Sequence, residues 1–390
     1  MTDRTEIPIR TVLLLSDDWS DTVEGHIAIN KALSLSLTGY EGVRVCCATL
    51  RTPDESSLAD AAKAKVQLIS LTSDRNQHLT QLYAGFNDNP QALWTKATLG
   101  KVPDVSFIVG HSPGTAEAAI KLRDSSYPSS KVILFFHVVP DDLEWLADKL
   151  PYRLPADDDL VRLAETADVV YSVTNQVHSF FEAKFRNRAQ KPVDHRLYVP
   201  QCTRAVFDIE PERDRKFSKN SGLRVLVLGR GLGVEDWQGL DIAASAVAKV
   251  ATLLKDRGGP TVSLIVGDVP RSQREIVRTA LAALTEGSDL KLDVKTYDKA
   301  DTQFRDMAKY HLCLVPSRAE PFGYAGLLPI SAGIPTLIAE DSNLASIIKR
   351  LTIDPSQFLG RHIMHFSRSN TFLLSSLHVC ICNVHSTIRI

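Results

Sequence analysis

Short apolar runs rich in β-branched residues recur along this 390-residue chain, and each is followed by a segment with helical spacing. This recurrence limits the fold more than any other feature. Continuous apolar runs are typical of parallel strands, because both faces of such strands are buried. Strands that alternate with helices predict a doubly wound α/β sheet. In the first half the expected strands are Thr11–Ser16, Val43–Thr49, Val66–Leu71, Ser106–Gly110, Lys131–His137, Asp168–Thr174 and Arg196–Pro200.

A charged segment, Ile209–Asn220, interrupts the series, which then restarts. It has few side chains that a core would bury, so it is typical of a linker. We therefore predict two Rossmann-like doubly wound domains, 1–205 and 223–350, joined by a linker at 206–222. The expected strands of the second domain are Arg224–Gly229, Val262–Gly267, Leu292–Tyr297, Leu312–Ser317 and Thr336–Glu340.

Residues 351–390 are expected to form an atypical tail. Arg361–Ile390 contains no Asp or Glu and four of the chain's 11 histidines. Its apolar part, 371–382, is shorter than the ~20 residues that a membrane span needs. The tail also holds two histidines and two cysteines, but their spacing matches no usual zinc finger, so an aberrant C-terminus is the preferred interpretation. These four residues are His378, Cys380, Cys382 and His385.

The net charge limits which partners the protein attracts, and the cysteines indicate its redox environment. Lys and Arg total 45 against 46 Asp and Glu, so the net charge of −1 gives no overall field to attract nucleic acid or anionic lipid. An anionic ligand must therefore be held by a local site. The six cysteines are scattered, mostly within apolar runs, which favours reduced thiols. With no apolar stretch long enough for a signal or membrane segment, we expect a cytoplasmic protein.

In such sheets ligands bind at the carboxyl ends of the strands, so the candidate site residues are sought there. Glu320 lies between the end of an expected strand and a Pro-Phe-Gly turn that opens a helix. Its carboxylate would accept sugar hydroxyls while the helix N-terminus faces phosphates. A plain helix-capping carboxylate fits the same pattern, and both interpretations stay open.

A glycine loop, Gly229–Gly233, follows the first strand of the second domain. Arg230 within it would clamp two phosphate oxygens in place of a metal ion, although a surface arginine fits equally well. A dinucleotide fingerprint needs a third glycine at position 234 or 236, where Val234 and Asp236 stand instead. An NAD-dependent oxidoreductase is therefore a poorly supported alternative.

Taken together, these residues resemble the retaining GT-B glycosyltransferases of the group 1 family. The resemblance spans Thr11 to Leu351, and its most specific parts are Leu314–Gly323 and Ser331–Thr336. It implies a GT-B fold, in which two Rossmann-like domains face a cleft. It also implies that Glu320 binds the donor sugar, and that the backbone amides of Phe322 and Gly323 reach the same sugar.

The resemblance assigns further positions. It places Arg230 on the donor diphosphate, the amide of Gly25 near a phosphate, and His137 beside the reacting sugar. A core histidine is the alternative for His137, and His111 is a weaker candidate of the same kind. The run Asp157-Asp158-Asp159 could imitate a metal clamp, but it precedes a helical segment, so we interpret it as structural.

The implied reaction is hexosyl transfer from a UDP- or GDP-sugar to an unidentified acceptor, with retention. It needs no metal and no cofactor beyond the nucleotide-sugar itself. Positive side chains and helix dipoles would stabilise the leaving diphosphate, whose oxygen accepts the acceptor's proton.

Several departures from the family pattern affect the expected donor site. Leu328 replaces a second glutamate and Gln238 replaces a lysine, and a charged hydrogen bond contributes about 1.5–3 kcal/mol. Pro329 interrupts the helix expected from Gly323. Where the chain enters its tail, helices that complete the second domain in the family are missing, which would leave this domain truncated. A catalytically weak or inactive protein that binds a nucleotide-sugar or another protein is therefore the alternative.

Overall fold

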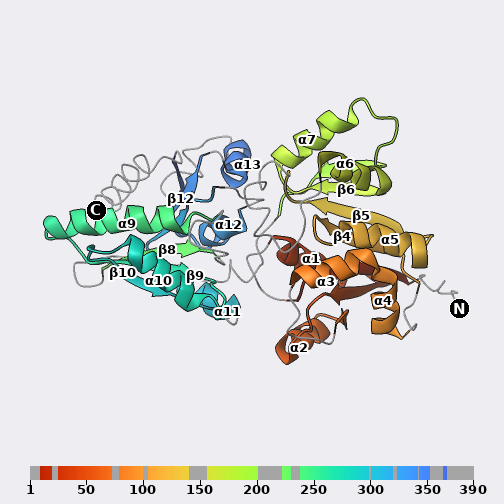
Figure 1. The fold of residues 1–390 in the computed structure, drawn as a ribbon, viewed down its shortest axis with the longest axis horizontal. Helices are drawn as coiled ribbons and strands as arrows, with labels where there is room; N and C mark the ends of the chain where they lie inside the picture. Colours follow the sequence, from red (N-terminus) through yellow and green to blue (C-terminus); the bar gives the residue numbers. More distant parts are fainter. Residues whose placement is uncertain are drawn as a thin grey trace, which may run out of the picture. The chain divides into compact units, whose positions relative to one another are not determined.

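The computed structural model divides into two compact units, Met1–Pro200 and Gln201–Ile390 (Figure 1). Most of the expected linker, 206–221, lies outside the described residues. Among the described helices, none has both the length and the apolar composition that crossing a membrane requires. The structure describes residues 9–19, 25–72, 79–99, 104–139, 156–200, 222–229, 238–297, 300–318, 323–340, 342–351 and 363–366.

The first unit contains a seven-stranded, all-parallel sheet in the order β3-β2-β1-β4-β5-β6-β7, so the predicted doubly wound fold is confirmed. The last strand pairs with its neighbour from Asp194 rather than from Arg196, because this edge strand begins with polar residues that an apolar pattern misses. The strands are β1 Arg10–Ser16, β2 Val43–Thr49, β3 Val66–Ser70, β4 Phe107–Ser112, β5 Lys131–Phe136, β6 Val169–Ser172 and β7 Asp194–Leu197.

Helices connect these strands, and side-chain caps fix where several of them begin. The Asp54 carboxylate accepts a 2.7 Å hydrogen bond from the Ser57 amide at the start of α2. The run Asp157-Asp158-Asp159, expected just before a helix, forms the first turn of α6, where carboxylates interact favourably with the helix dipole. The helices are α1 Gly25–Leu37, α2 Glu55–Lys63, α3 Leu79–Asp88, α4 Pro90–Thr98, α5 Ala116–Ser126, α6 Asp157–Thr166 and α7 Asn175–Phe185.

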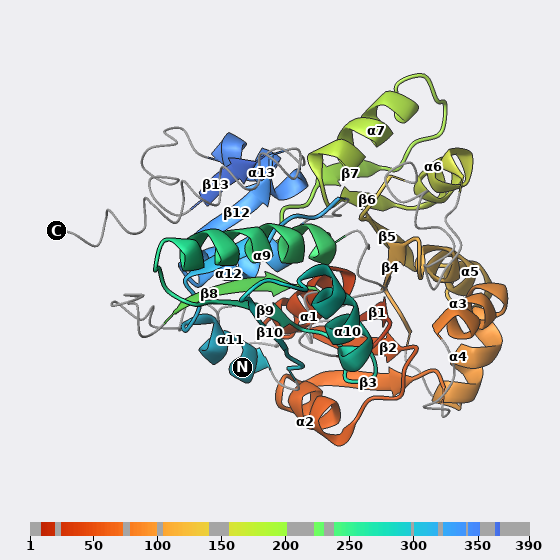
Figure 2. The ribbon, with the colours of Figure 1, turned by 60° about the vertical axis from the view of Figure 1, so that its left-hand side comes forward.

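The second unit repeats the arrangement with a six-stranded parallel sheet in the order β10-β9-β8-β11-β12-β13. Helix α9 packs against β8 and β9 (Figure 2). Its strands are β8 Leu223–Leu228, β9 Val262–Gly267, β10 Lys291–Val294, β11 Leu312–Val315, β12 Thr336–Ala339 and β13 Ile363–Phe366. Its helices are α9 Leu240–Asp256, α10 Arg274–Leu284, α11 Ala300–Met307, α12 Tyr324–Ser331 and α13 Asn343–Leu351.

Strand β13 belongs to the segment expected to be a tail. It pairs in parallel with β12, from Thr336 opposite Ile363 to Ala339 opposite Phe366. This part of the segment therefore continues the second sheet, contrary to the expectation that it departs from the fold. Strand pairing is made by backbone groups, so four residues can join a sheet edge without the longer apolar run that identified the other strands.

Each sheet has a point where the direction of winding reverses, and this point positions the candidate site. In the first unit it lies between β1 and β4, and in the second between β8 and β11. In doubly wound sheets ligands bind beside the carboxyl ends of the two strands at such a point. Beside the first of these points, helix α5 packs closely against strand β4. A Cβ atom on Gly110 would lie 2.8 Å from that of Ala119, so glycine lets α5 rest directly on β4.

Candidate active site

Buried polar side chains gather at the carboxyl edge of the first sheet, beside its winding reversal. Asp17 follows β1, Asn30 comes from α1, His111 from β4, and His137 follows β5. All four are at most 7% exposed. Burying a polar group destabilises the folded state unless the group is hydrogen-bonded, so each of these side chains is expected to have a partner.

Three of these side chains form a hydrogen-bonded chain. The Asn30 amide nitrogen donates to the Leu15 carbonyl at 2.8 Å, which turns its oxygen toward His111. That oxygen lies 2.8 Å from Nε2 of His111, and Nδ1 of His111 lies 2.8 Å from Nε2 of His137. An amide oxygen only accepts, so Nε2 of His111 carries the hydrogen and Nδ1 of the neutral ring accepts from His137. Because neutral His137 donates through Nε2, the lone pair of its ring lies on Nδ1.

Both histidines are neutral at physiological pH. Burial, with an added effect of His26, lowers the pKa of His137 to about 3. Burial and the neighbouring His137 and His26 hold the pKa of His111 well below its usual value. A ring with such a pKa is a poor proton acceptor near pH 7. His137 is therefore suited to accept a hydrogen bond from a hydroxyl group through Nδ1.

A second group surrounds Asp17. Its carboxylate lies 2.9 Å from Nε2 of His26 and accepts a hydrogen bond from the hydroxyl of Tyr83. Burial alone would raise the pKa of Asp17, but His26, Tyr83 and the charge of Arg51 together bring this pKa below its usual value. Asp17 is therefore an anion that holds His26, whose ring centre lies 6.2 Å from that of His137.

Gly25 opens α1 next to this group. The first amides of a helix have no acceptor within the helix, and the helix dipole makes that end attractive to anions. The position of Gly25 therefore fits the predicted contact between its amide and a phosphate.

In the second unit, glycines let the two connections at the winding reversal touch. A Cβ atom on Gly229, which follows β8, would lie 2.4 Å from Oε1 of Gln238. Gly239 has φ +70°, and a Cβ atom there would lie 2.3 Å from the Pro316 carbonyl oxygen that follows β11. Gln238 is 7% exposed, and its buried side chain lies against Gly229. Only glycine combines this backbone angle with so close an approach.

The connection after β11 is held by an ion pair and by the start of α12. Arg318 donates two hydrogen bonds, of 2.8 and 2.5 Å, to the carboxylate of Asp241 in the first turn of α9. Gly323 precedes α12 with φ 98°, and its carbonyl accepts from the Leu327 amide at 2.8 Å. Pro329 lies inside this helix as expected. These contacts lie on the described elements that flank the predicted phosphate and sugar residues.

Residues 13–370 match the family model described as "Family 4 Glycosyltransferase in conflict systems". The chain belongs to this family. No curated protein matches the sequence. The family membership confirms the predicted class of enzyme, a glycosyltransferase, and excludes the oxidoreductase alternative that rested on the glycine loop.

Solved structures of low sequence identity share the GT-B fold of this glycosyltransferase. Sucrose-phosphate synthase from Thermosynechococcus elongatus matches at 14% identity over 96% of this chain and 90% of that chain, with a TM-score of 0.67. HepE of Anabaena, in complex with UDP and glucose, matches at 15% identity over 95% and 90%, with a TM-score of 0.60. A trehalose 6-phosphate synthase from Burkholderia multivorans matches at 13% identity over 97% and 95%, with a TM-score of 0.57.

The structure of this glycosyltransferase locates some of the predicted site residues. Gly25 and His137 lie at the first reversal, while Gln238 and Gly323 flank the second. Leu328 lies in α12 and is 7% exposed. The remaining predicted residues, Arg230, Glu320 and Phe322, lie outside the described residues.

The sequence analysis of this glycosyltransferase did not predict four residues that lie around His137 and His111. Asp17 carried a usable signal, since it is a carboxylate directly after the first strand, and so did His26, beside Gly25 at the helix start. Asn30 and Tyr83 lie within helices and carried no such signal. Their partners are 81 and 66 residues away in the chain, so only the fold brings them together.

Proposed function

We propose that this glycosyltransferase moves a hexosyl group from a UDP- or GDP-sugar to an acceptor, with retention and without a metal ion. The observation that carries the proposal is the neutral, buried His137 at the winding reversal of the first sheet, held by His111 and Asn30. A polar side chain kept uncharged at a ligand-binding edge suits a sugar hydroxyl better than a phosphate. It complements the anion-binding start of α1 at Gly25.

In the proposed reaction each group has a separate role. Arg230 and the amide of Gly25 bind the diphosphate, and their positive charge stabilises it as it leaves. Glu320 and the amides of Phe322 and Gly323 hold the donor sugar, while Nδ1 of His137 accepts from one of its hydroxyls. The bond from the anomeric carbon to the phosphate oxygen breaks, and a bond to the acceptor oxygen forms. The acceptor's proton passes to the leaving phosphate oxygen.

The choice of donor is supported by a structural neighbour. HepE of Anabaena has been solved with UDP, with UDP-glucose and with UDP and glucose. UDP-sugars are therefore the first donors to test, with GDP-sugars next.

Two buried residues favour a second candidate function, a protein that binds a nucleotide-sugar or a partner without transferring sugar. Leu328 and Gln238 are each 7% exposed. They replace the glutamate and the lysine expected at the donor site. Losing two charged hydrogen bonds, each of about 1.5–3 kcal/mol, would weaken donor binding by roughly two or more powers of ten.

Calorimetric titration of the full chain with UDP, GDP, ADP and their glucose conjugates, in the presence of a chelator, tests donor binding. We expect one nucleotide to bind. Arg230→Ala should weaken this binding about ten- to a hundredfold, while Arg257→Ala, at an exposed arginine, leaves it unchanged. Binding that Arg230→Ala does not change would refute the assignment of the diphosphate site.

Transfer is tested by incubating the binding donor with candidate acceptors and following the product's anomeric configuration by NMR. Retained configuration in the presence of the chelator, lost in Glu320→Ala and kept in Glu286→Ala at an exposed carboxylate, supports the proposal. Inverted configuration or a requirement for metal would contradict it. Donor binding without turnover on any acceptor would favour the binding protein.

A further inference from the structure

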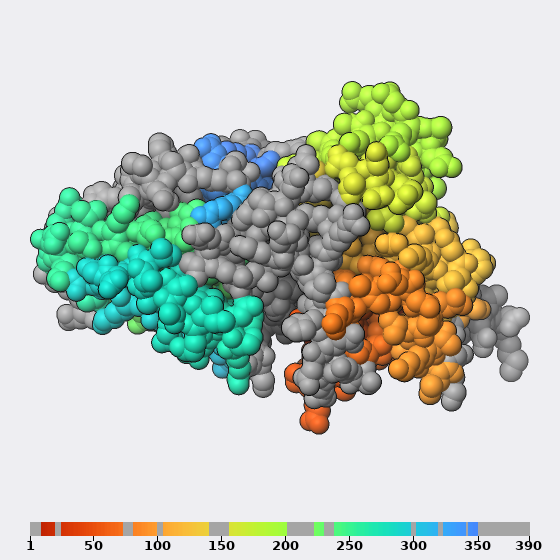
Figure 3. Space-filling view, viewed as in Figure 1, coloured from red at the N-terminus to blue at the C-terminus, as the bar shows by residue number. Residues whose placement is uncertain are grey.

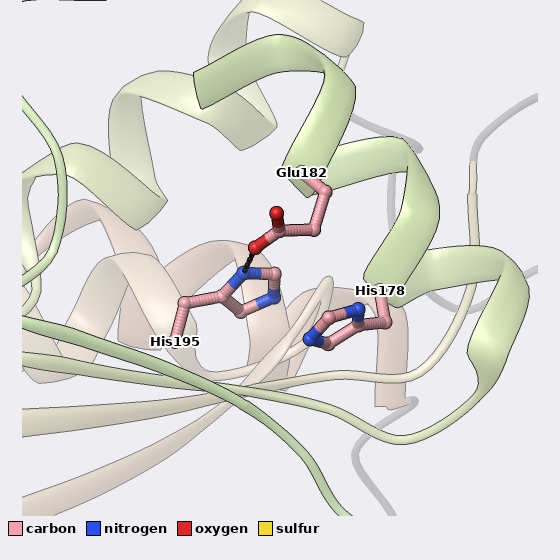
Figure 4. Close-up of side chains that lie close together, drawn as sticks. All are labelled: His178, Glu182 and His195. Atoms are coloured by element: carbon pink, nitrogen blue, oxygen red, sulfur yellow. Dashed lines mark hydrogen bonds and ion pairs between the residues drawn. The ribbon is translucent and has the colours of Figure 1, made fainter. Parts of the chain in front are cut away.

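A separate cluster of metal-ligating side chains lies where α7 packs on the edge strand β7. His178 and Glu182 are four residues apart on α7 and so share one face of the helix, and His195 lies on β7. One ligand atom from each lies within 4.8 Å of the other two. Figure 4 shows the two rings side by side, with the Glu182 carboxylate at a ring nitrogen of His195.

The spacing within the cluster fits a tetrahedral ion. Metal–ligand bonds of about 2.0–2.1 Å place the ligand atoms of a tetrahedral zinc site about 3.3 Å apart. Nδ1 of His195 lies 3.2 Å from Oε1 of Glu182, close to that value. The rings of His178 and His195 stack with their centres 4.4 Å apart, so His178 must turn about its side-chain torsions to complete the site. No described residue hydrogen-bonds the His178 ring, so no such bond opposes this rotation.

A second layer already orients His195. Its Nε2 lies 2.9 Å from Oγ of Ser172, a fully buried side chain on β6. A histidine that binds metal through one ring nitrogen usually donates through the other, which fixes its tautomer and orientation. Ser172 is placed to accept this hydrogen bond and leaves Nδ1 directed at Glu182.

The cluster is also accessible from solvent, as uptake of an ion requires. The Glu182 side chain is 59% exposed, whereas that of His195 is 7% exposed, so the cluster is open on one side and anchored on the other. The segment that carries it lies at the surface of the first unit (yellow-green in Figure 3). In the sheet β7 is three strands from β4, so this cluster is distinct from the candidate active site.

We propose that His178, Glu182 and His195 bind a zinc-class transition-metal ion that clamps α7 to the edge strand β7. Two imidazoles and one carboxylate suit Zn²⁺, Ni²⁺ or Co²⁺, whereas Mg²⁺ and Ca²⁺ prefer sites made of oxygen ligands alone. A fourth position, open to solvent beside Glu182, is filled by water. Because the ion binds the folded chain, it stabilises this end of the first unit.

The test is titration of the chelator-stripped full chain with Zn²⁺, read by calorimetry and by hydrogen exchange of peptides from 175–197. The expected result is one Zn²⁺ bound with added protection of α7 and β7. His178→Ala and Glu182→Gln, both at the surface of α7, should each weaken this binding by roughly tenfold or more. Glu286→Gln, at an exposed carboxylate of the second unit, should leave it unchanged.

Other outcomes overturn the proposal. Absence of Zn²⁺ binding would mean that the three side chains form only a hydrogen-bonded contact between helix and strand. Binding that persists in both α7 variants, or that protects other peptides instead, would place the ion elsewhere in the chain. Protection of 175–197 by Mg²⁺ as strongly as by Zn²⁺ would contradict the ligand chemistry.

Discussion

Lowering the pH from 7.5 to 5.5 should destabilise the first unit, because His137 stays neutral in the folded chain. Its pKa is about 3 when folded, against about 6.5 for an unfolded histidine. Between these values the unfolded chain takes up a proton that the folded chain does not bind. Stability is therefore complete above the unfolded pKa and falls as the pH drops toward the folded pKa.

The size of this effect follows from the two pKa values. At pH 5.5 proton uptake lowers the free energy of the unfolded state by RT ln 11, which costs about 1.4 kcal/mol of stability from His137 alone. His111 adds a loss of the same sign, because its pKa is also lowered. Asp17 does not contribute in this range. Its pKa lies below the usual value of 3.8, so its stabilisation is lost only in stronger acid.

Hydrogen exchange of peptides from β4 and β5, in a urea series at both pH values, measures the free energy of unfolding locally. His137→Gln keeps a donor for Nδ1 of His111 but removes the titrating ring. Its loss of stability between the two pH values should be smaller than that of the wild type by about 1.4 kcal/mol. His311→Gln, in the second unit, should not alter the pH dependence of these peptides.

Equal pH dependence in the wild type and in His137→Gln would refute this reasoning, because the ring would then titrate normally in the folded chain. Imidazole nitrogen shifts give a second check that needs no variant. They should report a neutral His137, protonated at Nε2, throughout this pH range.

Two further predictions concern packing at the winding reversals. Gly239→Ala should destabilise the second unit by about 2 kcal/mol or more, because it combines φ +70° with a Cβ 2.3 Å from the Pro316 oxygen. The control Gly287→Ala changes a glycine with φ +77° and open space around it, and should lower the free energy of unfolding by only about 1 kcal/mol. Equal urea midpoints for the two variants would show that the contact with Pro316 does not cause the destabilisation. Asn30→Leu leaves Nε2–H of buried His111 unpaired and should lower the free energy of unfolding by about 1–3 kcal/mol, as measured by hydrogen exchange of β4 peptides. An unchanged free energy of unfolding would contradict the proposed series of hydrogen bonds.

Sequence patterns predict the parallel strands well because burial on both faces leaves a continuous apolar run, as in Thr11–Ser16. They predict less at the sheet edges. Strand β7 begins with Asp194 and His195, and β13 has only four residues in a segment of unusual composition. At such edges backbone pairing decides the structure, and backbone groups leave little mark on the sequence.

The same limit applies to the candidate site. Searching the strand ends located His111 and His137, because the chain order alone predicts that strand ends converge. It could not locate Asn30, which lies on the buried face of α1 and is paired across 81 residues. Nor could it reveal that the Gln238 side chain lies against Gly229, because this contact depends on the tertiary structure.

The pKa values at the first reversal bear on where the proton goes in the proposed transfer. The terminal phosphate of the leaving nucleoside diphosphate resembles a phosphate monoester, whose second pKa is near 6, whereas the pKa of His137 is about 3 and that of Asp17 lies below 3.8. Moving a proton to His137 rather than to the phosphate would therefore cost about 4 kcal/mol. The leaving phosphate is the stronger base of the three, which is the condition that a substrate-assisted transfer needs. In the proposed transfer, burial keeps His137 uncharged, its hydrogen bond to His111 leaves Nδ1 to accept from a sugar hydroxyl, and the start of α1 attracts the diphosphate.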